Sequence, residues 1–490
     1  MVYRSVSDFY AGKTLMITGA TGFIGKVLLE KLLRCCPDIK KIFLLVRPKR
    51  DKGAAARIKE ITSGIMFDKV REAQPNFRAK LVPIESDLIQ PDLALKEEDI
   101  RILQEETELV FHVAATVRFD EKLSISLQMN VFATRKILQL SKGMEKLLVF
   151  HHVSTAYSNC DQSRIEEAVY PPPVDPYKIL DATEWMSDDM IEALTPMLLG
   201  KRPNTYTFTK ALAEYVVMEE GKGLPICITR PSTVLAAWKE PFPGWVDNIL
   251  GASGLVVAVG KGLVTTVLCD PQAILDVTPV DVIVNAMIGV TWYTGVHKPA
   301  SISVYNLVTS HDIPYKLGTH WADLVNCLEI FPMEKALGRP MVQLTKYSMM
   351  KINQRVVRLV YALRYFMFNT WDFSHQNIEA LSTAMNEKDR EVFFTDVRTL
   401  HGPSYMKAYV LGAKRFILNE DIENLPAAHS HQRMLRNLRW TFNTVLAVVI
   451  WCILMTRSKV ARNFRTFVIN NFFRFIRRCR MLINSMGHSN

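Results

Sequence analysis

Two short motifs in this chain carry residue types whose spacing suits chemistry at a carbonyl group. The first is TGATGFIG at residues 18–25, and the second is YTFTK at residues 206–210. In the second motif a phenol and an ammonium lie four residues apart, so a helix places both side chains on one face. A phenol held beside an ammonium is suited to protonate a developing alkoxide. We therefore predict that Tyr206 and Lys210 are catalytic residues.

The glycine-rich motif follows an apolar run at residues 13–18 and opens a segment with helical spacing at residues 26–33. In a GxxGxxG pattern the first glycine permits a tight turn, the second lets the backbone approach a pyrophosphate, and the third allows close helix–sheet packing. The helix N-terminus adds amide hydrogens and partial positive charge. A bound dinucleotide is therefore predicted, with contacts from Thr18, Gly19, Thr21, Gly22, Phe23, Ile24 and Gly25.

Basic residues follow the second predicted strand, where NAD-specific proteins place an acid on the ribose. Here the sequence has Arg47, followed by Lys49 and Arg50. A guanidinium cannot accept a hydrogen bond from a ribose hydroxyl but suits a 2′-phosphate, so NADPH is favoured over NADH. A solvated basic loop is the alternative. Further cofactor contacts are expected from Tyr206 and Lys210 and, at other strand ends, from Asp87, Leu88, Ala114, Ala115 and Pro231.

A third catalytic group is expected in HVSTAY, at residues 152–157, where another predicted strand ends. Thr155 is the first choice and Ser154 the second, since a hydroxyl there would bind the substrate carbonyl and stabilise oxyanion charge. We also expect the Lys210 ammonium to lower the pKa of the Tyr206 phenol and to bind the nicotinamide ribose. The histidines near these strand ends show no ligand pattern, so no metal is predicted.

Apolar runs that alternate with helix-like segments predict an α/β fold with right-handed crossovers. The fold class is a doubly wound parallel-sheet Rossmann fold with an interleaved substrate region. Residues 1–331 would form this NADP-binding domain, and residues 332–426 a small C-terminal helical domain without a glycine-rich turn. The predicted strands lie at residues 13–18, 41–46, 80–84, 109–113, 147–153 and 226–229.

The C-terminal region holds all of the net charge of +11, because residues 424–490 contain 11 Lys and Arg and no Asp or Glu. An uncharged apolar run of 16 residues, 440–455, is flanked by arginines on both sides. A spanning helix needs ~20 residues, within a range of ~17–25. Basic flanks and boundary tryptophans favour a membrane-anchoring helix at 440–456 over a buried soluble helix. Residues 457–490 then form a basic, aromatic tail, and no nucleic-acid partner is predicted.

The chain resembles the fatty acyl-CoA reductases, the alcohol-forming members of the extended short-chain dehydrogenase group, and within them the vertebrate peroxisomal type. The matching strings include VFHVAATVRFDE, YPPPVDP, RPNTYTFTKALAEYVV and RPSTVLAAWKEPFPGWVDN, and the resemblance covers nearly the whole chain. It implies reduction of a long-chain acyl-CoA to a primary alcohol with two NADPH, through an enzyme-held aldehyde. It also implies a role in wax and ether lipid synthesis at the peroxisomal membrane, with the catalytic body in the cytosol.

One departure from this family lies between Pro340 and Trp371, where the family carries an additional apolar segment and this chain is shortened. A catalytically weakened, membrane-bound NADPH-binding protein is therefore one alternative. Another is a sterol dehydrogenase or nucleotide-sugar epimerase, which would share Thr155, Tyr206 and Lys210. Chain-length preference, oligomeric state and membrane topology stay open from the sequence.

Overall fold

The computed structural model describes residues 5–49, 52–337, 343–345, 354–422, 425–457, 463 and 466–477. Arg50, Pro340 and the last part of the basic tail lie outside the described residues.

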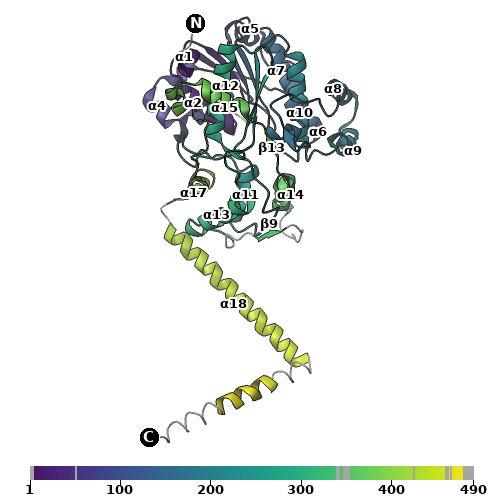
Figure 1. Cartoon of the computed structure of the whole chain (residues 1–490), viewed down its shortest axis with the longest axis vertical. Coiled ribbons are helices and arrows are strands. Elements are labelled where there is room, and N and C mark those ends of the chain that lie inside the picture. Colours follow the sequence, from purple (N-terminus) through teal and green to yellow (C-terminus); the bar gives the residue numbers. More distant parts are fainter. Residues whose placement is uncertain are drawn as a thin grey trace.

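Parallel strands form the central sheet of the protein (Figure 1). Its order is β11-β7-β5-β4-β1-β2-β3, and every neighbouring pair is parallel. From β1 the chain builds outward through β2 and β3, and then returns to add the other strands on the opposite side. This reversal next to β1 confirms the predicted doubly wound fold and puts its switch point at the carboxyl ends of β1 and β4, where such folds bind ligands. The strands are β1 Thr14–Thr18, β2 Lys41–Val46, β3 Leu81–Glu85, β4 Leu109–His112, β5 Val149–Val153, β7 Ile226–Pro231 and β11 Ser303–Leu307.

Helices cover both faces of the sheet, and alternate strand residues enter two separate apolar cores. Leu15 and Ile17 of β1 pack with helices α2 and α12 on one face, whereas Met16 packs toward α5 and α7 on the other. Because both faces are buried, these strands are continuous apolar runs rather than alternating ones. The helices of this body are α1 Val6–Tyr10, α2 Phe23–Cys35, α3 Ala54–Ser63, α4 Asp68–Ala73, α5 Glu97–Glu106, α6 Leu123–Leu127, α7 Ala133–Lys142, α8 Pro176–Trp185, α9 Asp188–Leu199, α10 Thr205–Glu220 and α12 Val280–His297.

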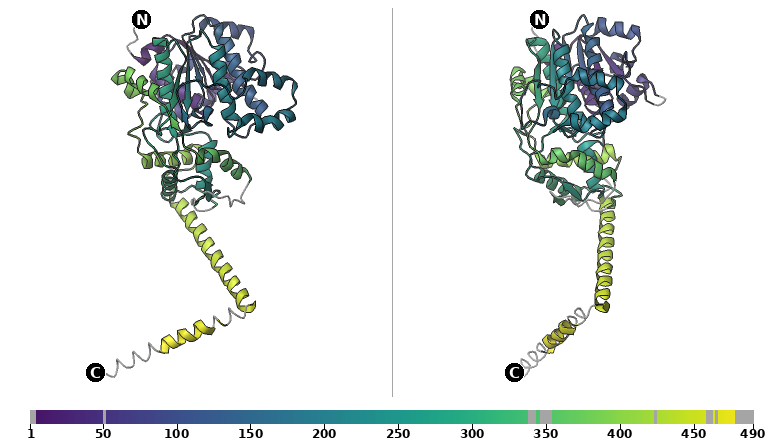
Figure 2. Two further views of the ribbon diagram at one scale, coloured as in Figure 1. Left: turned by 45° about the vertical axis from the view of Figure 1, so that its right-hand side comes forward. Right: turned by 90° about the vertical axis from the view of Figure 1, so that its right-hand side faces the viewer.

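Besides these two cores, a further apolar cluster lies at the carboxyl side of the sheet, among helices α11, α13, α14 and α17 (Figures 1 and 2). It draws side chains from both sides of residue 331, while α15 packs against α12 and β11 of the body. The domain boundary at 331 therefore stays a prediction. These elements are α11 Gly251–Gly260, α13 Leu317–Ile330, α14 Gln354–Phe368, α15 Gln376–Ala384, α16 Glu387–Val392 and α17 Gly402–Gly412, with short strands β6 Arg164–Ile165, β8 Thr233–Leu235, β9 Thr266–Leu268, β10 Val277–Pro279, β12 Gln343–Thr345 and β13 Asp372–Phe373.

The long helix α18, Leu425–Arg457, extends away from the rest of the molecule (Figures 1 and 2). Its segment Leu425–Leu454 is long and apolar enough to cross a membrane, and none of its most apolar stretch is buried against the protein. The helix begins at Leu425, well before the apolar run at residue 440. Its first part, which contains Arg433, Arg436 and Arg439, lies on the side of the body. A further helical segment covers residues 466–477.

Candidate active site

The glycine-rich turn joins β1 to α2 and needs glycine at two positions for steric reasons. Gly19 has a φ of +76°, and a Cβ there would lie 2.7 Å from the backbone nitrogen of Ala114. A Cβ at Gly25 would lie 2.2 Å from the carbonyl oxygen of Gly19. The turn and the first turn of α2 are therefore packed too closely for any side chain at either position.

The N-terminus of α2 fits the phosphates of a dinucleotide. Gly22 is the N-cap residue, it is exposed, and no side chain in the described part of the protein caps the helix. The first amide groups of α2 therefore have no side-chain acceptor, and their partial positive charge favours an anion. Thr21, Phe23 and Ile24 are half-buried around this turn, and the Phe23 ring stacks on Trp245 at 5.4 Å between centroids.

Thr18 connects the ends of two strands. Its Oγ1 lies 2.8 Å from Nδ1 of His112 and accepts a hydrogen bond of 3.2 Å from the backbone N–H of Ala114. With this side chain 1% exposed, Thr18 fixes β1 to the segment that follows β4. Any direct contact of Thr18 with the cofactor stays a prediction, as do the other predicted cofactor contacts.

The remaining predicted cofactor residues follow the carboxyl ends of neighbouring strands, so they share one edge of the sheet. Arg47 is exposed directly after β2, and the Arg57 guanidinium donates to its backbone carbonyl. Four residues are half-buried after β3 and β4: Asp87, Leu88, Ala114 and Ala115. Pro231 is buried at the end of β7.

Tyr206 and Thr155 lie together at this same edge. Tyr206 is the second residue of α10, whose N-cap is Asn204, and Thr155 caps the short turn after β5. Burial raises the pKa of Tyr206 to about 12, against the lowering effect of its hydrogen bond with Thr155. Ser154 is buried beside them, and its Oγ has no hydrogen-bond partner among the described residues. The hydroxyls of Tyr206 and Thr155 can thus both approach one substrate oxygen.

Lys210 is buried one helical turn beyond Tyr206. Its Nζ donates a hydrogen bond of 2.7 Å to the carbonyl oxygen of Val153, at the end of β5. Burial lowers the pKa of Lys210 to about 8, and the Glu214 carboxylate offsets part of that effect. The expectation that Lys210 lowers the pKa of the Tyr206 phenol is wrong for this structure, because the ammonium is directed at a backbone carbonyl and burial raises the phenol's pKa instead.

Sequence reasoning missed a buried ion pair that supports α10. Arg230 of β7 is fully buried and binds Glu214 through two contacts, at 2.9 and 2.7 Å. Its guanidinium also donates to the carbonyl oxygens of Glu166 and Ala168. A glutamate one helical turn after Lys210, together with an arginine before Pro231, was the available signal. The pair fixes α10, the helix that carries Tyr206 and Lys210, to the sheet.

Two of the strand-end histidines, His112 and His151, bind neighbouring side chains. His112 and His151 each contact two threonine hydroxyls at 2.8–3.0 Å. Burial lowers the pKa of both to about 3, so both are neutral near pH 7. Elsewhere, three potential ligand atoms of His311, Asp312 and His375 lie within 4.8 Å of one another, a group that sequence reasoning did not single out.

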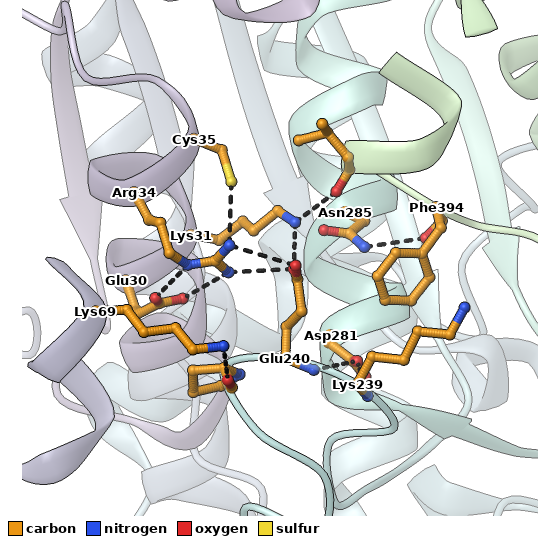
Figure 3. Close-up of polar contacts among 12 residues, drawn as sticks. Glu30, Lys31, Arg34, Cys35, Lys69, Lys239, Glu240, Asp281, Asn285 and Phe394 are labelled. Carbon is orange, nitrogen blue, oxygen red and sulfur yellow. Dashed lines mark hydrogen bonds and ion pairs between the residues drawn. The ribbon is translucent and has the colours of Figure 1, made fainter. Parts of the chain in front are cut away.

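A charged network holds α2 from the side of the loop at residues 238–245 (Figure 3). Lys31 is 2% exposed and pairs with Glu240, which Arg34 also contacts at 3.1 Å. Asp281 of α12 accepts hydrogen bonds from three successive backbone N–H groups of this loop, at 2.7–3.0 Å. The loop is therefore fixed between the cofactor helix α2 and α12.

A doubly wound sheet with a glycine turn at its switch point, and a Thr–Tyr–Lys group at the same edge, defines the extended short-chain dehydrogenase/reductase class. Two family models described as "Male sterility protein" match residues 17–287 and 339–420. The chain is 44% identical to fatty acyl-CoA reductase 1 of Pongo abelii and 43% identical to that of Homo sapiens, covering 96% of this chain and 98% of each relative. It is 42% identical to fatty acyl-CoA reductase 2 of Mus musculus, over 96% and 97%. The chain belongs to the fatty acyl-CoA reductase family, a family of oxidoreductases that use a nicotinamide cofactor.

Among solved structures, the chain is similar in fold to the terminal R domain from the myxalamid PKS-NRPS biosynthetic pathway. That similarity has a TM-score of 0.59 at 23% identity and covers 82% of this chain and 90% of the other. The alignment with the human reductase spans 502 positions, more than the 490 residues of this chain, so gaps fall in this chain. Whether they coincide with the shortened region after Pro340 stays a prediction.

Proposed function

We propose that this protein reduces long-chain fatty acyl-CoA to the primary alcohol with NADPH and releases CoA, through an aldehyde that stays in the site. The observation that carries this proposal is the interaction of the Tyr206 phenol with the Thr155 hydroxyl, at the same edge of the sheet as the glycine turn. Membership of the fatty acyl-CoA reductase family supports the thioester as substrate.

The reaction consumes two hydrides and two protons per thioester, and the bound nicotinamide supplies each hydride. Thr155 and Tyr206 donate hydrogen bonds to the thioester oxygen and stabilise its developing charge. Once the thioester carbon has received a hydride, the resulting hemithioacetal anion collapses to the aldehyde and the C–S bond breaks. The CoA thiolate that leaves takes up one of the two protons. The same hydroxyls then bind the aldehyde oxygen. Tyr206, with a pKa of about 12, is protonated at neutral pH and donates its proton to the alkoxide.

The preference for NADPH is supported by two guanidinium groups after β2. Arg47 is exposed directly after β2, where we expect the 2′-phosphate of the adenosine ribose, and the Arg57 guanidinium of α3 contacts the Arg47 carbonyl. A guanidinium pairs well with a phosphate but cannot accept a hydrogen bond from a ribose hydroxyl. Arg47→Asp should raise the KM for NADPH at least tenfold and improve the use of NADH. Unchanged preference in steady-state kinetics would contradict this assignment.

Attachment to the peroxisomal membrane, with the body in the cytosol and the alcohol entering wax and ether lipid synthesis, is part of the same proposal. It is supported by the exposed apolar helix α18 and by the resemblance to the vertebrate peroxisomal type. Protease protection on isolated peroxisomes tests the topology: the body should be cleaved without detergent. Protection of the body would reverse the proposed orientation.

The activity is tested with purified full-length protein in detergent, palmitoyl-CoA or stearoyl-CoA, and NADPH. We expect the corresponding alcohol, with two NADPH oxidised per molecule. Tyr206→Phe should lower kcat by about 100-fold or more, since general acid catalysis contributes about 10²–10⁴-fold. The dissociation constant for NADPH should be nearly unchanged in this variant. NADPH binding without any turnover by the wild-type protein would instead support the catalytically weakened alternative.

A further inference from the structure

An open groove of about 670 Å³ runs along α14. This volume lies within the range of sites that hold small ligands, about 300–1,000 Å³. One wall comes from two loop segments of the body, and the other is a face of α14. The lining residues are Phe119, Asp120, Pro203, Asn204, Tyr361, Ala362, Arg364, Tyr365, Phe368 and Asn369.

The groove reaches two residues that adjoin the catalytic phenol. The Phe119 ring packs on the Tyr206 ring, with centroids 5.9 Å apart and planes 29° apart, and it contacts Phe366 of α14 at 5.4 Å. Asn204 is the N-cap residue of α10, two positions before Tyr206. A ligand lying in the groove would therefore have one end at Phe119 and Asn204, the residues that adjoin Tyr206.

Asn204 offers an unused hydrogen-bond donor at this end of the groove. The residue is 5% exposed, and its Oδ1 accepts a hydrogen bond of 2.9 Å from the backbone N–H of Thr207. Its Nδ2 has no hydrogen-bond partner among the residues that the structure describes. Since buried donors are rarely left unpaired, this amide would gain a partner if its side chain turned toward a ligand in the groove.

The chemistry of the lining favours a ligand that is partly polar. Aromatic side chains alternate with the carboxylate of Asp120, the guanidinium of Arg364 and the amide of Asn369. A bare hydrocarbon chain would cover these groups and leave Asn204 unpaired, which is unfavourable. A chain that carries amides and a hydroxyl between short alkyl segments matches both kinds of side chain.

We propose that this groove binds the pantetheine arm of the acyl-CoA thioester, with Asn204 Nδ2 donating to one of its amide carbonyls. The arm then places the thioester sulfur and carbonyl beside Tyr206, and the acyl chain lies on the other side of the catalytic residues. This assignment rests on the proposed function, because it takes the substrate to be a CoA thioester.

The test measures binding separately from turnover, using the full-length protein in detergent and the unreactive thioether S-hexadecyl-CoA. Ala362→Trp fills the groove, and Asn204→Asp keeps a good helix cap while removing the amide donor. Ala193→Trp, on the exposed face of α9, is the matched control. We expect the dissociation constant to rise at least tenfold for Ala362→Trp and about fivefold for Asn204→Asp, with no change for the control.

Reduction of the free aldehydes hexadecanal and butanal distinguishes the arm from the acyl chain. If the arm occupies the groove, Ala362→Trp weakens S-hexadecyl-CoA binding at least tenfold more than it raises the KM for either aldehyde. A loss with hexadecanal that is absent with butanal would place the acyl chain in the groove and overturn the assignment. Unchanged binding of S-hexadecyl-CoA would overturn it as well. Tight binding without reduction of palmitoyl-CoA would contradict the proposed function but leave the groove assignment supported.

Discussion

At the scale of single residues, burial determines the protonation of both predicted catalytic groups. Burial raises the pKa of Tyr206 to about 12 and lowers the pKa of Lys210 to about 8. Both shifts favour the neutral form, because a low-dielectric site disfavours charge. Over the neutral range the phenol therefore keeps its proton, and Lys210 is the group closest to titration.

We expect kcat/KM to fall as the pH rises through about 8. Below that pH Lys210 is an ammonium that donates to the Val153 carbonyl and can bind the cofactor ribose; above it the amine has lost its charge. Tyr206, with its pKa of about 12, titrates well above this limb. A pH–rate profile with decanal and NADPH measures the limb. A descending limb near pH 10 or above would assign it to the phenol instead.

Glu214→Gln should change both stability and this pH limb. The substitution leaves Arg230 buried without its carboxylate, and breaking such a buried pair costs about 3–5 kcal/mol. It also removes the charge that raises the pKa of Lys210, so the alkaline limb should move to lower pH. Thermal unfolding and the pH–rate profile check the two effects, with the exposed Glu192→Gln of α9 as control. A limb that does not move would show that Lys210 does not set it.

At the scale of elements, we expect the β1–α2 turn to contain one glycine required for packing, Gly25, and one that approaches the cofactor, Gly22. A methyl group at Gly25 meets the Gly19 carbonyl at 2.2 Å, whereas at Gly22 the nearest atom, the same carbonyl, is 3.2 Å away. Gly25→Ala should therefore destabilise the fold by about 1–3 kcal/mol, the usual cost of overpacking. Gly22→Ala should raise the dissociation constant for NADPH at least tenfold with little change in melting temperature. Equal losses of stability in both variants would contradict this division.

The strands were predictable where a strand is a continuous apolar run, and not where tertiary contacts stabilise polar residues. Residues 41–46 and 109–113 show such runs, and β2 and β4 occupy them. The edge strand β11 was missed because Asn306 interrupts its sequence; that side chain is fully buried and donates to the carbonyls of Ile165 and Ser374. Partners more than 60 positions away in the chain cannot be read from local pattern.

For the candidate site too, the local features could be predicted from the sequence and the long-range contacts could not. The motifs that contain Tyr206 and Gly19 are local, so their spacing predicts both elements that carry them. The Val153 carbonyl that receives the Lys210 ammonium, and the Phe119 ring that packs on Tyr206, come from other strands and loops. Sequence spacing alone therefore predicted the residue types at the site but missed the direction of the pKa shift of Tyr206.

At the scale of the whole molecule, α18 should be separable from catalysis. The first turns of α18 contact the body, since Ala428 is buried and His431 lies 2.8 Å from the carbonyl oxygen of Ala336. Exposed side chains beyond Arg439 include Trp440, Phe442 and Trp451. A chain that ends at Arg439 should keep the contacts of α18 with the body and lose the apolar segment that a bilayer would cover.

This truncated chain should therefore stay in solution without detergent and no longer float with phosphatidylcholine vesicles in a density gradient, whereas the full chain should float. Its kcat for decanal with NADPH should stay within twofold of the full-length value, because no described residue of the catalytic edge contacts the removed part. A truncated chain that still floats would place the membrane contact on the body rather than on α18. A large loss of decanal reduction in a folded, soluble chain would show that residues 440–490 support the site itself.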